Sequence, residues 1–524
     1  MKLRTIVKIA ITSSVVLLCS GFALYSFFRL SAAEGQKDFN LYELVPSTTS
    51  AVFVTDDVLE FVAEVDELTC SKNQQYLYVS KLFSYLKQSL YVLSEDTPHG
   101  LSRQMNQMLI SFHEPDNERN QVLYCRLGNG DKELVNRFVR KYISSLYPPK
   151  TFIYKGEEII IYPMADGDFL ACYLTSDFMA LSFQKKLIEN VIDAYKSGKS
   201  LADDSTFIGI RAPKKSAAAA TIYTRMQGMM GWTEFDMKMK DDFIYFSGIT
   251  HDADTCFAFI NQLRQQQSVK GFPGEVLPST AFYFSRQGIT DWVSLLSYGN
   301  AQGQSVPART SEVQNRDKEF SRYLMENAGQ DLVACLFQRE DTLQGAAAVL
   351  SLSVADVTEA ERMLRALVNA ASADEGRRNP RITFCYTVNK AYPIYRLPQT
   401  TLFEQLTSFA EPTLDVYAAF YGGRLLLAPD ADALAHYIRQ LDKGEVLNGA
   451  MVYQTGMDHL SDSYHFMLMA DFDHIFQQSE NHVRFVPDFF LRNADFFRHF
   501  TLFVQFACAD GVVYPNIVLK YKSE

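Results

Sequence analysis

The chain has 524 residues, of which 47% are hydrophobic and 21% are charged. This length corresponds to roughly two to four domains, and the composition excludes a disordered chain or a disulfide-stapled miniprotein. Lys and Arg number 50 against 61 Asp and Glu, which gives a net charge of -11. A surface with this charge repels phosphate backbones and anionic lipids, so we expect no nucleic-acid partner.

The N-terminal part contains a long apolar segment. Ile9 to Phe28 is a run of twenty residues without a charged side chain, and Arg29 follows it. Twenty helical residues span about 30 Å, the thickness of the hydrocarbon layer of a bilayer, whereas a cleaved signal peptide has an apolar stretch of only about 7 to 15 residues. The run therefore predicts a retained transmembrane helix.

Basic residues on one side of this helix predict its orientation, because such residues stay in the cytoplasm. They are Lys2, Arg4 and Lys8. We expect a cytoplasmic tail at 1–8, an inner-membrane anchor at 9–28 and a linker at 29–38, with the rest of the chain in the bacterial periplasm. The alternative is a signal peptide cleaved after Ala33, since Ser31 and Ala33 are small residues at a suitable spacing.

Eight cysteines are present, and the seven outside the anchor are an odd number without a C-x-x-C pair. Most lie in apolar, strand-like runs, which is not the pattern of a disulfide framework. We interpret them as small buried hydrophobic residues, with at most one or two disulfides. They are Cys70, Cys125, Cys172, Cys256, Cys335, Cys385 and Cys508.

The order of predicted elements after the anchor occurs twice. The sequence at 44–48 precedes a strand-like run at 51–55, and the similar sequence at 276–280 precedes another at 281–285. A second strand-like run then leads into an amphipathic helix in each copy. These runs are 121–125 before a helix around 134–142, and 346–350 before a helix around 363–368. Thr358 and Glu361 suggest a capping box at the second helix.

A hairpin is predicted next in each copy. The strands are 152–154 and 159–162 around Lys155-Gly156, and 382–386 and 392–395 around Asn389-Lys390. The best-aligned stretch follows, where 175–207 lies over 421–453 at an offset of 246 without a gap. Each copy there has a strand and a helix that ends at a glycine, Gly198 or Gly444.

Each copy closes with a pair of strands, 236–240 and 243–247 or 502–507 and 512–521. Mixed helices and strands with short connections predict an α+β fold with largely antiparallel sheets. We therefore expect two duplicated units after the transmembrane helix, at 39–271 and 272–524.

The motifs that suggest chemistry do not fit their context. Gly198-Lys199-Ser200 resembles the end of a phosphate-binding loop, but the first glycine of that motif is replaced by Asp193. His459, His465, His474, His482 and His499 lie close in sequence without the helical spacing of a metal site, and 471–474 has no matching ligands in the other copy. We expect no enzyme activity, no metal and no cofactor. The rival hypothesis is an envelope hydrolase whose site is assembled from loops.

The second copy contains an insert. Between aligned positions it has 23 residues where the first copy has 4. The region near 481–500 is rich in phenylalanine, and part of it repeats at helical spacing. One interpretation is a helix that covers its own sheet; the other is a docking element, since exposed apolar patches mark interaction sites. The candidate partner-binding residues are Phe485, Phe489, Phe490, Phe496 and Phe497.

The apolar N-terminal run, the entry at Leu44 to Thr48 and the turn at Lys196 to Leu201 together resemble an uncharacterised family of single-span bacterial envelope proteins. This resemblance implies the topology and the duplication, and it carries no catalytic residues. The expected function is non-enzymatic: a membrane-anchored protein that binds or scaffolds an envelope protein or an apolar ligand in the periplasm.

Overall fold

The computed structural model describes residues 39–72, 105–113, 119–128, 131–139, 147–164, 167–211, 218–225, 231–250, 258–290, 292, 310–339, 346–374, 381–388, 390–398, 416–477 and 488–522. The predicted anchor at 9–28 lies outside these residues. None of the helices within them combines the length and the apolar character needed to cross a bilayer.

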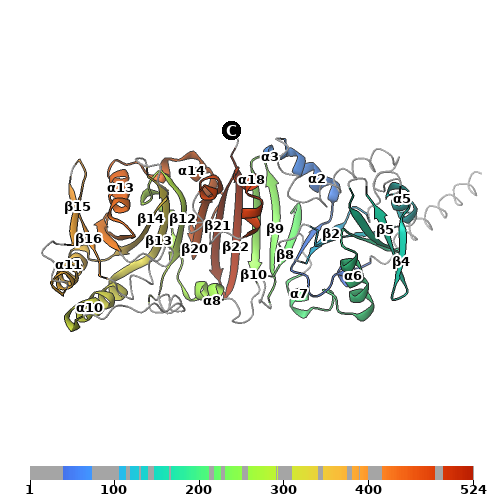
Figure 1. Cartoon of the computed structure of the whole chain (residues 1–524), viewed down its shortest axis with the longest axis horizontal. Helices are drawn as coiled ribbons and strands as arrows, with labels where there is room; N and C mark the ends of the chain where they lie inside the picture. Colours follow the sequence, from blue (N-terminus) through green and yellow to red (C-terminus); the bar gives the residue numbers. More distant parts are fainter. Residues whose placement is uncertain are drawn as a thin grey trace, which may run out of the picture.

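Among the described residues, twenty strands form one antiparallel sheet that runs along the length of the molecule (Figure 1). Ten of them come from the first half of the chain. From the outer edge inward the order is β4 (Lys150–Tyr154), β5 (Glu157–Pro163), β6 (Phe169–Leu174), β7 (Phe178–Ser182), β3 (Gln121–Arg126), β2 (Met108–Phe112), β1 (Ala51–Thr55), β8 (Ala220–Thr224), β9 (Thr233–Lys240) and β10 (Phe243–Thr250).

The other ten strands come from the second half. From the centre outward they are β22 (Val512–Tyr521), β21 (Phe500–Ala509), β20 (Phe466–Asp471), β12 (Ala281–Gly288), β13 (Ala328–Gln338), β14 (Ala346–Val354), β18 (Arg424–Ala428), β17 (Tyr417–Tyr421), β16 (Ala391–Arg396) and β15 (Ile382–Tyr386). The mixed α+β class with a largely antiparallel sheet is therefore confirmed.

The strand connectivity reads the same from both outer edges. Counted from the outer edge, each half has an outer hairpin (β4–β5 or β15–β16), two further strands (β6 and β7, or β17 and β18) and then another pair (β3 and β2, or β14 and β13). Next come the strand that opens the half (β1 or β12) and three closing strands (β8 to β10, or β20 to β22). The halves meet where β10 pairs with β22, from Phe243 opposite Lys520 to Ser247 opposite Asn516. β4 and β15 consequently lie at opposite ends of the sheet (Figure 1).

Two small features repeat at matching places in the halves. Pro46 forms an isolated bridge with Ser200, and Pro278 forms one with Val446. Both partners follow a helix that ends at a left-handed glycine, Gly198 (φ 63°) after α6 or Gly444 (φ 75°) after α13. Ser200 and Val446 are separated by 446 − 200 = 246 positions, the offset found in the sequence.

Helices cover both faces of the sheet. In the second half α13 (Ala431–Asp442) lies on one face, and α10 (Ser311–Asn327) with α11 (Val357–Asp374) lies on the other. Strand residues alternate between these layers: Leu426 packs in the cluster with α13, while Leu425 and Leu427 pack with α10 and α11. In the first half α6 (Lys185–Ser197) and α7 (Ser205–Ile210) cover one face, and α2 (Val58–Glu67) and α5 (Asp131–Phe138) contribute to the opposite layer.

The remaining described elements are nine short helices and one pair of two-residue strands. They are η1 (Leu41–Leu44), α3 (Thr69–Lys72), α8 (Ala258–Gln265), η4 (Pro273–Glu275), η5 (Leu447–Gly449), α14 (Met451–Met457), α15 (Phe472–Phe476), α17 (Asp488–Arg492) and α18 (Ala494–Phe497), with β11 (Val269–Lys270) paired to β19 (Ser463–Tyr464).

Both predicted hairpins are confirmed, as β4–β5 and β15–β16. Lys155 and Gly156 both have positive φ, which suits the two-residue turn that joins strands of right-handed twist. The predicted capping box was wrong. α11 begins at Val357, and Asp356 caps it by accepting from the Glu359 N–H at 3.0 Å, so Thr358 already lies inside the helix.

The six described cysteines are free thiols. Cys70, Cys125 and Cys172 lie in one apolar cluster, and Cys335 and Cys385 lie in another, which confirms the interpretation of these five as buried hydrophobic residues. Cys508 is half-buried, and Cys256 lies outside the described residues.

A buried ionic cluster ties four strands of the second half together. The Asp331 carboxylate on β13 receives Arg286 Nε from β12 at 2.9 Å and Arg424 Nη1 from β18 at 3.2 Å. The Ser353 hydroxyl on β14 also donates to it, at 3.1 Å. Burial raises the pKa of Asp331, but the two guanidinium groups outweigh burial and hold it below its ordinary value.

Asp331→Asn should destabilise the fold, because it leaves two largely covered guanidinium groups without their counter-charge. We expect a loss of about 3 to 5 kcal/mol in the free energy of unfolding at neutral pH, measured by denaturant titration of the full chain in detergent. The exposed Asp458→Asn is the control and should change it by less than about 0.5 kcal/mol.

The difference between wild type and Asp331→Asn should also depend on pH. The folded-state pKa is lowered, so the stabilisation is present above the unfolded value of about 3.9 and is lost as the pH falls through the folded value. The two proteins should therefore converge in stability below about pH 4. A difference that stays constant there would contradict the assigned charge state.

Candidate functional site

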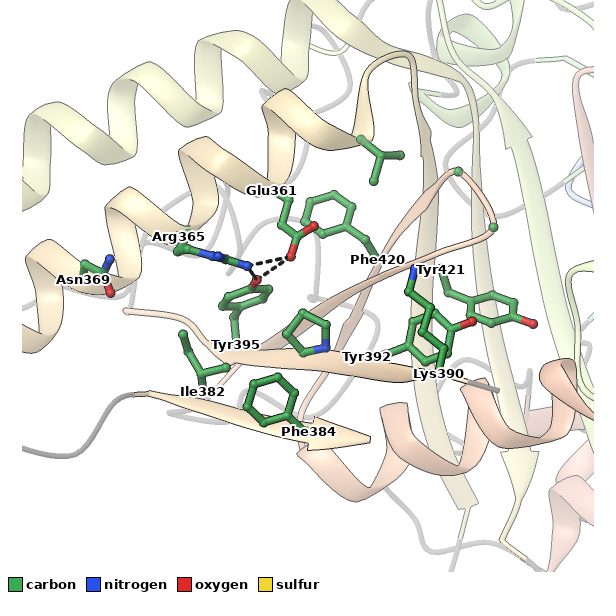
Figure 2. A pocket seen from close by; sticks show the side chains of 14 residues that line it. Glu361, Arg365, Asn369, Ile382, Phe384, Lys390, Tyr392, Tyr395, Phe420 and Tyr421 are labelled. Carbon is green, nitrogen blue, oxygen red and sulfur yellow. Dashed lines mark hydrogen bonds and ion pairs between the residues drawn. The ribbon is translucent and has the colours of Figure 1, made fainter. Parts of the chain in front are cut away.

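A cleft of about 660 Å³ lies at the outer end of the second half, between α11 and the strands β15 and β16 (Figure 2). α11 forms one wall, and the two strands form the opposite one. The lining side chains used below are Glu361, Arg365 and Asn369 from α11, Ile382 and Phe384 from β15, Lys390 from the hairpin turn, Tyr392 and Tyr395 from β16, and Phe420 and Tyr421 from β17.

Local geometry explains why these side chains meet. Glu361, Arg365 and Asn369 are spaced by four residues, which places them along one face of α11. Ile382 and Phe384 are two residues apart on a strand and therefore point to the same face of the sheet. Figure 2 shows Glu361 and Arg365 directed toward Tyr395 of β16.

Three polar groups form a closed hydrogen-bonded cluster in the cleft wall. The Tyr395 hydroxyl donates to Glu361 Oε1 at 2.6 Å, and Arg365 Nη2 lies 3.1 Å from the same oxygen. Arg365 Nη2 also donates to the Tyr395 hydroxyl at 3.0 Å. Burial, and then the hydrogen bond to Glu361, raise the pKa of Tyr395 to about 12. The phenol thus stays protonated, and the cluster fixes Arg365 at the wall.

Aromatic rings and cationic side chains make up much of the remaining surface. The Tyr392 and Tyr421 rings are 5.2 Å apart between centroids, and the Lys390 ammonium lies 5.2 Å from the Tyr392 centroid. Lys390 and Arg365 outnumber Glu361, so this cleft carries a positive charge in a chain whose net charge is -11. An acidic group with apolar neighbours is the complement of such a surface.

Among the described residues that line the cleft there is no Ser, Thr, Cys or His, and Glu361 already accepts two hydrogen bonds from charged or phenolic donors. In the part of the chain that the structure describes, no group of three or more His, Cys, Asp or Glu side chains is placed to hold a metal.

A second cleft of about 450 Å³ lies in the first half, beside β1, β2 and β8. Arg211 lies over the Tyr42 ring at 3.9 Å, and Gln107 donates to Asp56 at 2.5 Å. Burial raises the pKa of Tyr42 to about 12. The cleft beside α11 is larger, and more aromatic side chains line it than the two of this second cleft, Tyr42 and Tyr223, so it is the stronger candidate.

The structure places three of the five predicted docking residues of the insert, Phe490, Phe496 and Phe497, at its inner side. Phe497 is 5% exposed, and its ring centroid lies 4.8 Å from that of Phe490, which in turn packs on Phe472 at 5.0 Å. Phe496 is half-buried and contacts Phe500 at 5.0 Å. This packing favours the interpretation of the insert as a cover for its own sheet.

The other two insert residues are untested. Phe485 and the side chain of Phe489 lie outside the described residues, so a docking role for them stays a prediction.

Residues of the motifs that resemble a metal site and a phosphate-binding loop have structural roles. Asp471 caps α15 and binds Lys522 Nζ at 2.7 Å, while the Ser200 hydroxyl donates to Asp203 at 2.7 Å within a turn.

No sequence motif indicates a site at the cleft residues. Glu361 suggests a helix cap, and Arg365, Asn369 and Tyr395 belong to no recognisable motif. One signal is available in the sequence. The first strand of the hairpin at 382–395 carries the aromatic residues Phe384 and Tyr386 on one face and Cys385 on the other, so both of its faces are apolar although one buried face is enough for a strand at the edge of a sheet.

Comparison with protein-family models, with curated proteins and with solved structures finds no match for this chain.

The packing of the insert can be tested by stability. Phe497→Ala should lower the free energy of unfolding by about 3 to 5 kcal/mol, because it removes a buried ring and leaves a cavity. Phe384→Ala, at a ring that is 55% exposed, should cost less than about 1 kcal/mol in the same denaturant titration. Equal costs would contradict the inward packing of the insert.

Proposed function

We propose that the protein is a non-enzymatic, membrane-anchored protein of the bacterial envelope whose exported part binds a partner protein or an apolar ligand in the periplasm. Residues 9–28 would attach it to the inner membrane. The observation that carries the proposal is the cleft beside α11, which combines aromatic walls with a fixed guanidinium group. The rival function remains an envelope hydrolase with a site assembled from loops.

The composition of the cleft supports binding. Aromatic side chains provide large contact area at low entropic cost, and they are enriched in interfaces together with Arg. Tyr392, Tyr421 and Phe384 supply such area, and Arg365 is held in place by Glu361 and Tyr395. A partner that covers these groups gains apolar burial and a directed charge contact.

We further propose that the two units at 39–271 and 272–524 arose by duplication, as in the uncharacterised envelope family that the sequence resembles. The repeated strand order and the matching bridges at Pro46 and Pro278 support this origin. A duplicated scaffold needs only one specialised copy for binding, and the cleft beside α11 belongs to the second.

Photocrosslinking in cells tests the binding function. Asn369 is exposed in the cleft, so Asn369→p-benzoylphenylalanine should give a discrete adduct, detected as a gel shift for a protein or as a mass increase for a small ligand. Tyr421→Ala should lower the adduct yield about fivefold or more, because it removes part of the aromatic wall. The same probe at the exposed Lys199 is the control. Equal yields at both positions would refute binding at the cleft.

Accessibility labelling tests the location. In cells with an intact inner membrane, Lys199→Cys should react with a maleimide that enters the periplasm but not the cytoplasm, relative to the unsubstituted chain. The N-terminus of the purified protein should retain residues 9–28. Labelling only after lysis would contradict the periplasmic location, and a mature N-terminus at Glu34 would contradict the retained anchor.

A further inference from the structure

We propose that β15 is a docking strand: an extended segment of a partner polypeptide, with alternating apolar side chains and an acidic one, pairs antiparallel with its open edge and fills the adjoining cleft. This inference rests on the proposed binding function and specifies its partner. It also assigns a role to the outer edge of β15, with which no other described strand pairs.

The open edge follows from the strand order. Of the strands that the structure describes, β15 pairs only with β16, and it forms one end of the twenty-stranded sheet (Figure 1). An unpaired edge presents a row of backbone N–H and C=O groups, which is the template that strand addition uses.

Two hydrogen bonds fix which residues present those groups. The Thr387 N–H donates to the Lys390 carbonyl at 3.0 Å, and the Arg396 N–H donates to the Arg381 carbonyl at 2.8 Å. In an antiparallel pair, residues that bond to the partner alternate with residues whose backbone groups point away. Odd-numbered residues of β15 therefore face β16, and the backbone groups of Ile382, Phe384 and Tyr386 point to the open edge.

The same even-numbered residues carry the exposed apolar side chains. Phe384 is 55% exposed and Tyr386 is 70% exposed, whereas Cys385 between them is buried. Ile382 and Phe384 also line the cleft (Figure 2). One added strand would thus satisfy the open backbone groups and cover these rings, because directly opposed residues in antiparallel strands place their side chains on the same face.

Charge indicates another polypeptide as the occupant in preference to a second copy of this chain. Neither edge of a second copy contains an acidic residue, because β15 is Ile-Thr-Phe-Cys-Tyr and β4 is Lys-Thr-Phe-Ile-Tyr. Pairing β15 with either edge of a second copy would leave the net positive charge of the cleft, to which Arg365, Lys390 and Glu361 contribute, without a complement. An acidic side chain on the cleft face of another polypeptide supplies that complement.

A synthetic peptide provides the probe. The seven-residue sequence Glu-Thr-Phe-Thr-Ile-Thr-Val, running antiparallel to β15, places its Glu opposite Tyr386, its Phe opposite Phe384 and its Ile opposite Ile382. Binding of the fluorescein-labelled peptide to the full chain in detergent micelles is followed by anisotropy. We expect saturable binding, and a peptide with Lys in place of Glu should bind about tenfold more weakly.

Backbone methylation of the peptide tests strand pairing without changing the protein. N-methylation at its Phe removes an N–H directed at β15 and should weaken binding about tenfold, while N-methylation at the following Thr removes an N–H directed away and should have less than about a twofold effect. Equal effects at both positions, or no binding of the unmodified peptide, would overturn the proposal.

Matched protein variants give the complementary test. Phe384→Pro removes an N–H that points to the open edge and leaves the bonds to β16 intact, so the protein should fold with an unchanged circular dichroism spectrum. It should bind the peptide about tenfold more weakly than Phe384→Ala, which retains the N–H. Equal affinities of the two variants would overturn backbone pairing.

The outcomes separate this inference from the proposed function. A crosslink at Asn369, together with a peptide affinity that N-methylation does not change, would refute strand addition but would still support binding at the cleft. Absence of both the crosslink and peptide binding would refute both. Sedimentation of the full chain as a dimer that dissociates with Phe384→Pro, without competition by the peptide, would show that a second copy occupies the edge.

Discussion

The pairing of β10 with β22 is the contact on which the architecture depends. A ten-stranded antiparallel sheet has two edges, and an open edge is exposed to uncontrolled strand addition. Each half closes its inner edge against the other half, from Phe243 opposite Lys520 to Thr250 opposite Val513. Among the strands that the structure describes, four edges are thereby reduced to two, with β4 and β15 at the ends of the sheet. The position of the candidate site at one end is a consequence of that join.

An exposed apolar edge needs protection against self-association, and charge supplies it here. Edge strands are commonly guarded by Lys. Lys150 stands on the β4 edge and Lys390 stands beside β15, whereas Lys155 pairs with Asp193 and Arg365 pairs with Glu361. Neither edge strand contains Asp or Glu, so neither offers an acidic complement to the lysine at the other edge of a second copy.

The sequence predicted the local elements well and the long-range arrangement poorly. Both hairpins, the α+β class and the helix stops at Gly198 and Gly444 follow from short-range patterns, namely alternation, turn residues and left-handed glycines. Alternation identifies which face of a strand is buried, but it does not identify its neighbours. The cleft and the Asp331 cluster each depend on contacts between distant residues, such as Glu361 with Tyr395 at a separation of 34 and Arg286 with Asp331 at a separation of 45, so no local pattern could indicate them.

The Phe-rich insert packs on the region where β10 pairs with β22. Side chains of β10, β22 and the insert belong to one apolar cluster, in which Ile244 and Tyr521 lie with Phe497 and Phe500. Joining two sheets edge to edge creates a continuous apolar face across the seam, and that face needs a cover. α2 contributes to this layer from the first half, with Val65 in the same cluster, and α17 and α18 contribute from the second. The departure from symmetry between the two halves thus lies where they meet, and it completes the core that holds them together.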